Sequence, residues 1–313
     1  MHKHSTPAWC APSPRLQIRR ERIELPDGDF LDADWIMADG LPVGRPIVVL
    51  LHGLTGSIES KYIRGLLCSV RECGWRGVLM HFRGASGEPN RLARGYHSGE
   101  TGDIDYFVRL LKEREPSTPI ATVGFSLGGN VLLKWLGEQK ERAPVVTGVA
   151  VSVPFDLRIC AASIRQGFSR LYQFRLIRNM RRHAEAKFSR MPAPFELPNL
   201  HKLKDFFDFD EAMTAPLHGF KDVDDYYDRS SSRQFLRHIG VPTLVIHSVD
   251  DPFMSPEVVP TEAELSPLVT LELSKAGGHV AFVAADYRGR AKYWLESRIP
   301  AHLEGFFGGG RRG

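Results

Sequence analysis

A serine between glycines is the residue of this chain best suited to covalent chemistry. Residues 124–128 read G-F-S-L-G, directly after an apolar run and directly before a helix-like run. In a sharp strand-to-helix turn of this kind, the glycines relieve crowding against neighbouring elements, and the serine hydroxyl is exposed. The unpaired N–H groups and the positive dipole end of the helix favour an oxyanion there. The pattern therefore predicts Ser126 as a nucleophile.

A serine hydroxyl needs a general base, and the sequence offers a histidine after its last apolar run. His279 follows two glycines in a loop that comes after residues 269–273. Functional groups of α/β sheets gather at the carboxyl ends of the strands. We therefore expect His279 to be the base. His52 and His81 also end apolar runs, but they precede the serine.

The base needs a carboxylate to orient it, and two adjacent aspartates compete for this role. Asp250 and Asp251 both follow the apolar run at residues 243–247. Asp251 precedes Pro252 and is suited to capping the next turn, so we favour Asp250, with Asp251 as the alternative. The order Ser, Asp, His along the chain is that of α/β hydrolases, and not that of chymotrypsin or subtilisin.

Two backbone N–H groups are expected to hold the oxyanion. One belongs to Leu127, which follows the nucleophile, and the other to Leu54, in the loop after the apolar run at 47–51. His52 and Gly53 would hold this loop against the turn at Ser126. Because these groups supply nucleophile, base and oxyanion stabilisation, we expect neither a metal nor a cofactor.

A mostly parallel sheet must position these residues. Apolar runs without alternation suit strands that are buried on both faces. Such runs occupy residues 47–51, 77–82, 120–125, 145–153, 243–247 and 269–273. Helix-like segments lie between them at 60–73, 102–115 and 127–138, which is typical of a parallel α/β sheet. Residues 16–36, around the turn-forming stretch 26–29, predict an early antiparallel hairpin.

A stretch of about 80 residues, 157–235, interrupts this alternation. It contains no convincing buried strand, many aromatic residues, and too many residues for a bare loop. We predict a helical cap, or lid, inserted into a core formed by residues 1–156 and 236–313. Within that core, residues 1–15 are expected to be a loose lead-in and residues 308–313 a frayed tail. The aromatic residues of the cap predict an apolar acyl pocket beneath it.

The charges of the cap are divided between its two halves. Residues 158–190 carry nine Lys or Arg and one acidic residue, whereas residues 205–228 carry eight Asp or Glu and one Lys. Two solvated helix faces that pair with each other would explain this division. The alternative is a basic surface that meets an acidic head group or a membrane.

The composition as a whole is that of a globular protein. The 313 residues carry a net charge of +4, an excess too small to indicate nucleic acid. The four cysteines form no C-x-x-C pair and no zinc spacing with histidine, which predicts reduced thiols. The sequence shows no signal-peptide pattern and no apolar run near the ~20 residues of a membrane span. We expect a soluble, cytoplasmic protein, with peripheral membrane contact left open.

Several segments together resemble the α/β-hydrolase superfamily, and in detail its YheT-like branch, to which mammalian abhydrolase-domain lipases and phospholipases are related. These segments are HGLTGS (52–57), HFRGASGEPNR (81–91), YHSGETGD (96–103), GFSLGGN (124–130), SVDDPFMSP (248–256) and GGHVAF (277–282). The resemblance covers roughly residues 20–300. It implies the α/β-hydrolase fold and a serine hydrolase acting on short-chain acyl or lipid esters. It places the catalytic positions on Ser126, Asp250 and His279.

Three functions suit these residues. The first is hydrolysis of a small-molecule carboxylic ester, with an apolar acyl group, through an acyl-enzyme. The second is transfer of the acyl group to an alcohol or a thiol. The third is binding without catalysis, against which the presence of all three catalytic residue types counts. Nicotinamide-cofactor binding is excluded, because no G-x-G-x-x-G follows a strand.

Overall fold

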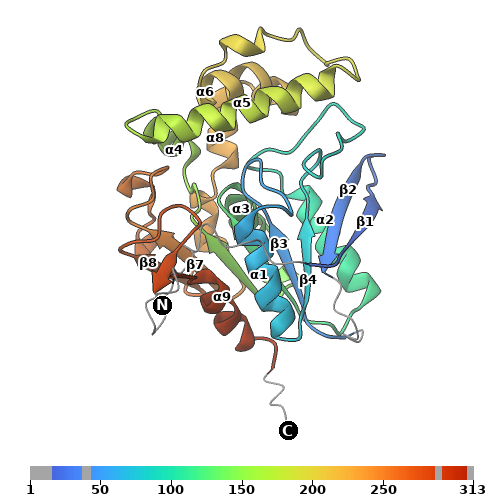
Figure 1. The fold of residues 1–313 in the computed structure, drawn as a ribbon, viewed down its shortest axis with the longest axis vertical. Helices are drawn as coiled ribbons and strands as arrows, with labels where there is room; N and C mark the ends of the chain where they lie inside the picture. The colour runs from blue at the N-terminus through green and yellow to red at the C-terminus, as the bar shows by residue number, and fades with distance from the viewer. Residues whose placement is uncertain (1–15, 37–43, 286–290, 309–313) are drawn as a thin grey trace, which may run out of the picture.

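Eight strands form one twisted sheet that carries the rest of the molecule (Figure 1). The computed structural model describes residues 16–36, 44–285 and 291–308, so the predicted lead-in and most of the predicted tail lie outside the described residues. The strands are β1 (Ile18–Glu24), β2 (Phe30–Ile36), β3 (Ile47–Leu51), β4 (Arg76–Met80), β5 (Ile120–Phe125), β6 (Thr147–Val151), β7 (Thr243–Ser248) and β8 (Val269–Ser274).

The strand order is β1-β2-β4-β3-β5-β6-β7-β8. Strands β3 to β8 run parallel, and the antiparallel pair β1 and β2 joins them at one edge through β4. The predicted parallel sheet and the predicted hairpin are both confirmed. A further short antiparallel pair joins β9 (Val283–Ala285) to β10 (Ala291–Tyr293).

The inner strands are buried on both faces, as their continuous apolar sequences predict. In β3, Val49 and Leu51 join the core on one side of the sheet, whereas Val48 and Leu50 join the core on the other side. The expectation of full burial is wrong for residues 269–273. Strand β8 lies at the edge of the sheet, and Leu273 is 47% exposed.

Helices cover both faces of the sheet. Helices α1 (Lys61–Glu72) and α9 (Leu295–Glu304) contribute to the core on one face, and α2 (Gly102–Arg114) and α3 (Leu127–Gln139) to the core on the other. Over the part of the chain that the structure describes, no helix is long and apolar enough to cross a bilayer. The cytoplasmic location stays a prediction.

The chain between β6 and β7 is described throughout and contains helices but no strand. The α-helices are α4 (Leu157–Ser163), α5 (Ser169–Phe188), α6 (Phe206–Phe209), α7 (Ala215–His218) and α8 (Val223–Ser230). In Figure 1, α4, α5 and α6 lie above the sheet, and α8 leads back toward it. These helices also hold two small apolar clusters of their own. The division into core and cap at residues 157 and 235 stays a prediction that these features support.

A buried arginine holds the irregular segment between β4 and α2. Arg83 donates from Nε and Nη2 to the two carboxylate oxygens of Asp103, over 2.8 and 2.6 Å. Its Nη1 donates to Asp27 and Asp29 over 2.6 and 3.1 Å. Asn90 donates a further hydrogen bond of 2.6 Å to Asp29. The hairpin turn, the segment at 81–101 and the start of α2 are therefore joined around one guanidinium.

Replacing Arg83 with Gln should leave the buried carboxylates of Asp29 and Asp103 without their cation. We expect Arg83→Gln to lower the free energy of unfolding by about 3–5 kcal/mol, measured by urea denaturation. The control is Arg109→Gln, which removes an exposed pair with Asp105 at i,i+4 and should cost only about 0.3–0.5 kcal/mol. Equal losses in the two variants would contradict this account of the network.

Candidate active site

Ser126 occupies the sharp turn between β5 and α3. Its φ is 52° and its ψ is −119°, a conformation that residues with a side chain rarely adopt. The N–H of Ser126 donates to the carbonyl oxygen of Val151 on β6 over 2.8 Å, and the N–H of Asn130 donates to the carbonyl oxygen of Ser126 over 3.0 Å. Sheet and helix together therefore hold the strained residue.

Two glycines make this turn possible. A Cβ atom on Gly124 would lie 2.4 Å from the carbonyl oxygen of Gly128 in α3. A Cβ atom on Gly128 would lie 2.6 Å from the carbonyl oxygen of His52 and 2.7 Å from that of Leu51. Because backbone atoms cannot give way as a flexible side chain can, only glycine fits at both positions. The predicted crowding is confirmed.

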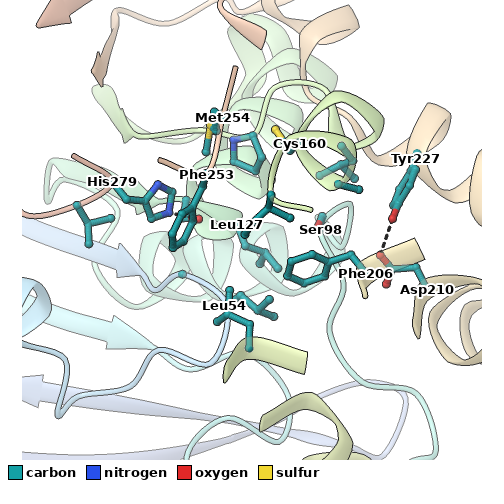
Figure 2. A pocket seen from close by; sticks show the side chains of 18 of the residues that line it. Leu54, Ser98, Leu127, Cys160, Phe206, Asp210, Tyr227, Phe253, Met254 and His279 are labelled. Atoms are coloured by element: carbon teal, nitrogen blue, oxygen red, sulfur yellow. Dashed lines mark hydrogen bonds between the residues drawn. The ribbon is translucent and has the colours of Figure 1, made fainter. Parts of the chain in front are cut away.

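His279 lies between Ser126 and an aspartate. Its Nε2 is 2.9 Å from Ser126 Oγ, and its Nδ1 is 2.8 Å from Asp251 Oδ2. An ionised carboxylate only accepts hydrogen bonds, so Nδ1 carries the proton and Nε2 is free to accept from the serine hydroxyl. The ring of Phe253 stacks on that of His279 with centroids 4.2 Å apart, which further fixes the imidazole (Figure 2).

The prediction that Asp250 orients His279 is wrong. Asp250 Oδ1 accepts hydrogen bonds from the N–H groups of Gly277 and Gly278, each 2.9 Å long, and from the Ser248 hydroxyl. These hydrogen bonds, led by the one from Ser248, lower the pKa of Asp250. Asp250 therefore anchors the backbone of the loop before His279 and does not contact its ring.

Asp251 is the carboxylate that contacts the His279 ring, and its two oxygens serve two partners. Its Oδ1 accepts from the N–H of Phe253 over 2.9 Å, which is the turn-capping role expected of it. Its Oδ2 remains available to His279, and the side chain is almost fully buried. The Asp251 carboxylate therefore both caps the turn and contacts His279, so the capping role does not exclude the contact with the ring.

Leu54 and Leu127 line the same cavity as Ser126 and His279. Leu127 is the first residue of α3, where N–H groups have no partner within the helix. A Cβ atom on Gly53 would lie 3.3 Å from Ser126 Cβ, so the loop of Leu54 lies against the elbow as expected. The use of the two N–H groups as oxyanion donors stays a prediction.

The loop that carries Leu54 is fixed by side chains from three parts of the chain. His52 donates from Nδ1 to the carbonyl oxygen of Gly53 over 2.7 Å, and burial lowers the pKa of His52 to about 3. The N–H of Gly53 donates to the hydroxyl of Tyr62 over 3.0 Å, and that of Thr55 to the hydroxyl of Tyr96 over 3.3 Å. The sequence analysis did not identify either tyrosine. Tyr96 begins the motif YHSGETGD, which could have drawn attention to it, whereas Tyr62 lies in no motif.

The cavity at Ser126 has a volume of about 310 Å³ and is lined mainly by apolar side chains (Figure 2). The chain between β6 and β7 supplies much of its wall, with Leu157 from α4, Leu176 from α5, Phe206 from α6 and Tyr227 from α8. These helices therefore cover the candidate nucleophile. The sequence predicted an apolar pocket at this place from the aromatic residues alone.

A second cavity of about 740 Å³ borders the first, because Leu54, Leu127 and Phe206 line both. Its wall is more polar and includes Lys187, whose pKa burial lowers to about 8. Asp210 also lines both cavities; its carboxyl is buried, which raises its pKa to about 7. Across the described ranges, no cluster of three His, Cys, Asp or Glu side chains could hold a metal ion.

The roles of the two aspartates can be separated by replacing each with Asn. Asp251→Asn should favour the wrong imidazole tautomer and slow the reaction of Ser126 with a fluorophosphonate probe roughly 10³- to 10⁴-fold. Asp250→Asn is the matched control. It leaves the hydrogen bond between Asp251 and the His279 ring in place, so it should slow labelling of Ser126 far less. A larger effect in Asp250→Asn than in Asp251→Asn would restore the original assignment.

Comparisons with known proteins show the family of the chain. Residues 46–286 match the family described as alpha/beta hydrolase fold. The chain is 43% identical to YheT of Escherichia coli over 90% of this chain and 84% of that protein. It is 29% identical to phospholipase ABHD3 of Homo sapiens, over 90% and 70% of the two chains, and 28% identical to monoacylglycerol lipase of Saccharomyces cerevisiae, over 88% and 61%.

The solved structures show the same fold. The esterase Pf2001 of Pyrococcus furiosus superposes with a TM-score of 0.58 over 94% of this chain and 92% of its own, at 20% identity. Family match, sequence identity and fold agree. The chain belongs to the α/β-hydrolase fold family, in the branch that contains YheT.

Proposed function

We propose that this protein hydrolyses carboxylic esters through an acyl-enzyme on Ser126. The observation that carries the proposal is the continuous hydrogen-bonded chain from Ser126 through His279 to Asp251, at the wall of an apolar cavity. The names of two relatives, a phospholipase and a monoacylglycerol lipase, support a lipid ester as the substrate class.

Each step of the proposed reaction can be assigned to a group at this site. Ser126 Oγ attacks the acyl carbon while its proton passes to His279 Nε2, and Asp251 stabilises the imidazolium that forms. The N–H groups of Leu54 and Leu127 hold the oxyanion. His279 then gives the proton to the leaving alcohol oxygen. Water attacks the acyl-enzyme, His279 takes the proton from this water, and the acid leaves as Ser126 regains its hydrogen.

The two cavities suit the two parts of an ester. The apolar cavity of about 310 Å³ suits the acyl chain, and the larger, more polar cavity suits the alcohol part. The smaller volume corresponds to about ten water molecules, or a similar number of methylene groups. An acyl group of medium length would therefore fill it.

Replacing Ser126 with Ala removes the attacking oxygen. We expect kcat for p-nitrophenyl butyrate to fall by roughly 10⁶-fold in Ser126→Ala, because the acyl-enzyme cannot form and only oxyanion stabilisation and substrate binding remain. Ser117→Ala, a serine exposed in the loop before β5, is the matched control and should keep its activity. Turnover by Ser126→Ala within tenfold of the unaltered chain would rule out this nucleophile.

The size of the apolar cavity predicts a chain-length profile. In a series of p-nitrophenyl esters, kcat/KM should rise with each methylene by at most about fourfold, because each buried methylene contributes about 0.8 kcal/mol. The rise should stop near ten carbons, where the cavity is full. A profile that is flat, or highest for acetate, would show that the acyl chain does not enter this cavity.

A further inference from the structure

Three large apolar side chains project into solvent at the beginning of α5. Phe168, just before the helix, is 73% exposed, Leu171 is 52% exposed and Phe174 is 56% exposed. Their spacing of three residues places them on neighbouring positions of the helix surface. Contiguous exposed apolar patches on soluble proteins often mark the sites at which these proteins bind a partner or a membrane.

A row of arginines continues the same side of the helix. Arg175, Arg178 and Arg182 are exposed. They follow Leu171 by four, seven and eleven residues, so they lie on the same side of the helix as Leu171. The opposite side of α5 buries Ile177 and Ala184 against the body of the protein. The outward side of α5 therefore changes from apolar to basic between Phe168 and Arg182, and Glu185, which pairs with His201, follows at the end of the same side.

The acidic half of the chain between β6 and β7 does not neutralise this row. In the described part of the chain, ion pairs between the two halves are made by Arg158, with Asp224 and Asp228, and by Arg165, with Asp205. The interpretation that the two halves pair with each other thus holds for these two arginines, at or before the start of α5. The three arginines of the row make no ion pair with any residue that the structure describes.

This surface lies directly over the candidate active site. On its inner side, α5 lines the first cavity with Leu176 and the second with Met180. At its beginning, the ring of Tyr172 is 5.1 Å from that of Phe253, which itself stacks on His279. A partner that covers the outward side of α5 would therefore lie next to both cavities.

We propose that the outward side of α5 docks on the anionic surface of a lipid bilayer. We call this surface the α5 face; it consists of Phe168, Leu171, Phe174, Arg175, Arg178 and Arg182. Aromatic and aliphatic side chains insert at the boundary between head groups and acyl chains, and arginines bind the lipid phosphates. The combination favours a bilayer over a nucleic acid, because phosphate binding alone would not require an exposed apolar patch. Docking brings both cavities to the membrane.

The proposal is tested by co-sedimentation of the full chain with vesicles. We expect binding to vesicles of phosphatidylcholine mixed with phosphatidylglycerol, and much weaker binding to phosphatidylcholine alone. High salt should weaken the binding, because it screens the arginines. Equal binding to both kinds of vesicle, or no binding to the anionic vesicles, would overturn the proposal. Binding to a DNA duplex of equal strength would also overturn it.

Two sets of variants separate the apolar and the basic parts of the α5 face. Each arginine near an anionic surface is worth roughly a fivefold change in partitioning, so Arg175→Gln, Arg178→Gln and Arg182→Gln together should weaken binding roughly 100-fold. Phe168→Ser with Phe174→Ser should weaken it at least tenfold, because two buried rings are lost. Binding that either set leaves unchanged would contradict docking through this face.

Matched controls lie at the opposite end of the molecule. Leu268→Ser removes an apolar side chain 44% exposed just before β8, and Arg142→Gln removes an exposed charge after α3. Both should bind vesicles as the unaltered chain does; equal losses in these controls would indicate a non-specific effect. Hydrolysis of soluble p-nitrophenyl butyrate by the α5-face variants should stay unchanged, which shows that they fold. Because sedimentation does not depend on catalysis, Ser126→Ala should bind normally.

Discussion

The backbone of Ser126 is held at a positive φ, and the arrangement of the site depends on this constraint. The strain is possible because β5 and α3 are both packed into the core, and because Gly124 and Gly128 let their backbones meet. The turn presents the serine oxygen to His279, at the edge of the sheet where the loops after β3 and β7 also arrive.

The helices between β6 and β7 form much of the wall of the cavity at Ser126. The sheet and its loops place Ser126 and His279 at the cavity, whereas α4, α5, α6 and α8 supply much of the cavity wall, which is the part of the site that would contact the proposed acyl group. Helix α5 has two sides with different proposed roles. Its inner side lines both cavities and its outer side carries the α5 face, so one helix connects the proposed membrane contact with the proposed chemistry.

The sequence predicted the main elements and the sharp turn at Ser126 well, because local patterns carry that information. Buried parallel strands appear as apolar runs, and the elbow at Ser126 has its own glycine pattern. The choice between Asp250 and Asp251 failed for a different reason. The choice depends on which of the two aspartates reaches the ring of His279, which lies 28 positions after Asp251 in the chain, and no local pattern records that contact. Tyr62 and Tyr96 were missed because no local pattern records where their hydroxyls point: Tyr62 reaches the loop of Leu54 from the next helix, α1, and Tyr96 from a segment 41 positions away.

In the proposed mechanism, Ser126 carries the acyl group between its two transfers. The most direct measurement is to quench the protein with acid during turnover of p-nitrophenyl butyrate and to map the modified peptide by mass spectrometry. We predict one butyryl group, attached to Ser126. Steady turnover with Ser126 unmodified after a rapid quench, or a butyryl group on another residue as the sole adduct, would show that Ser126 does not carry the acyl group.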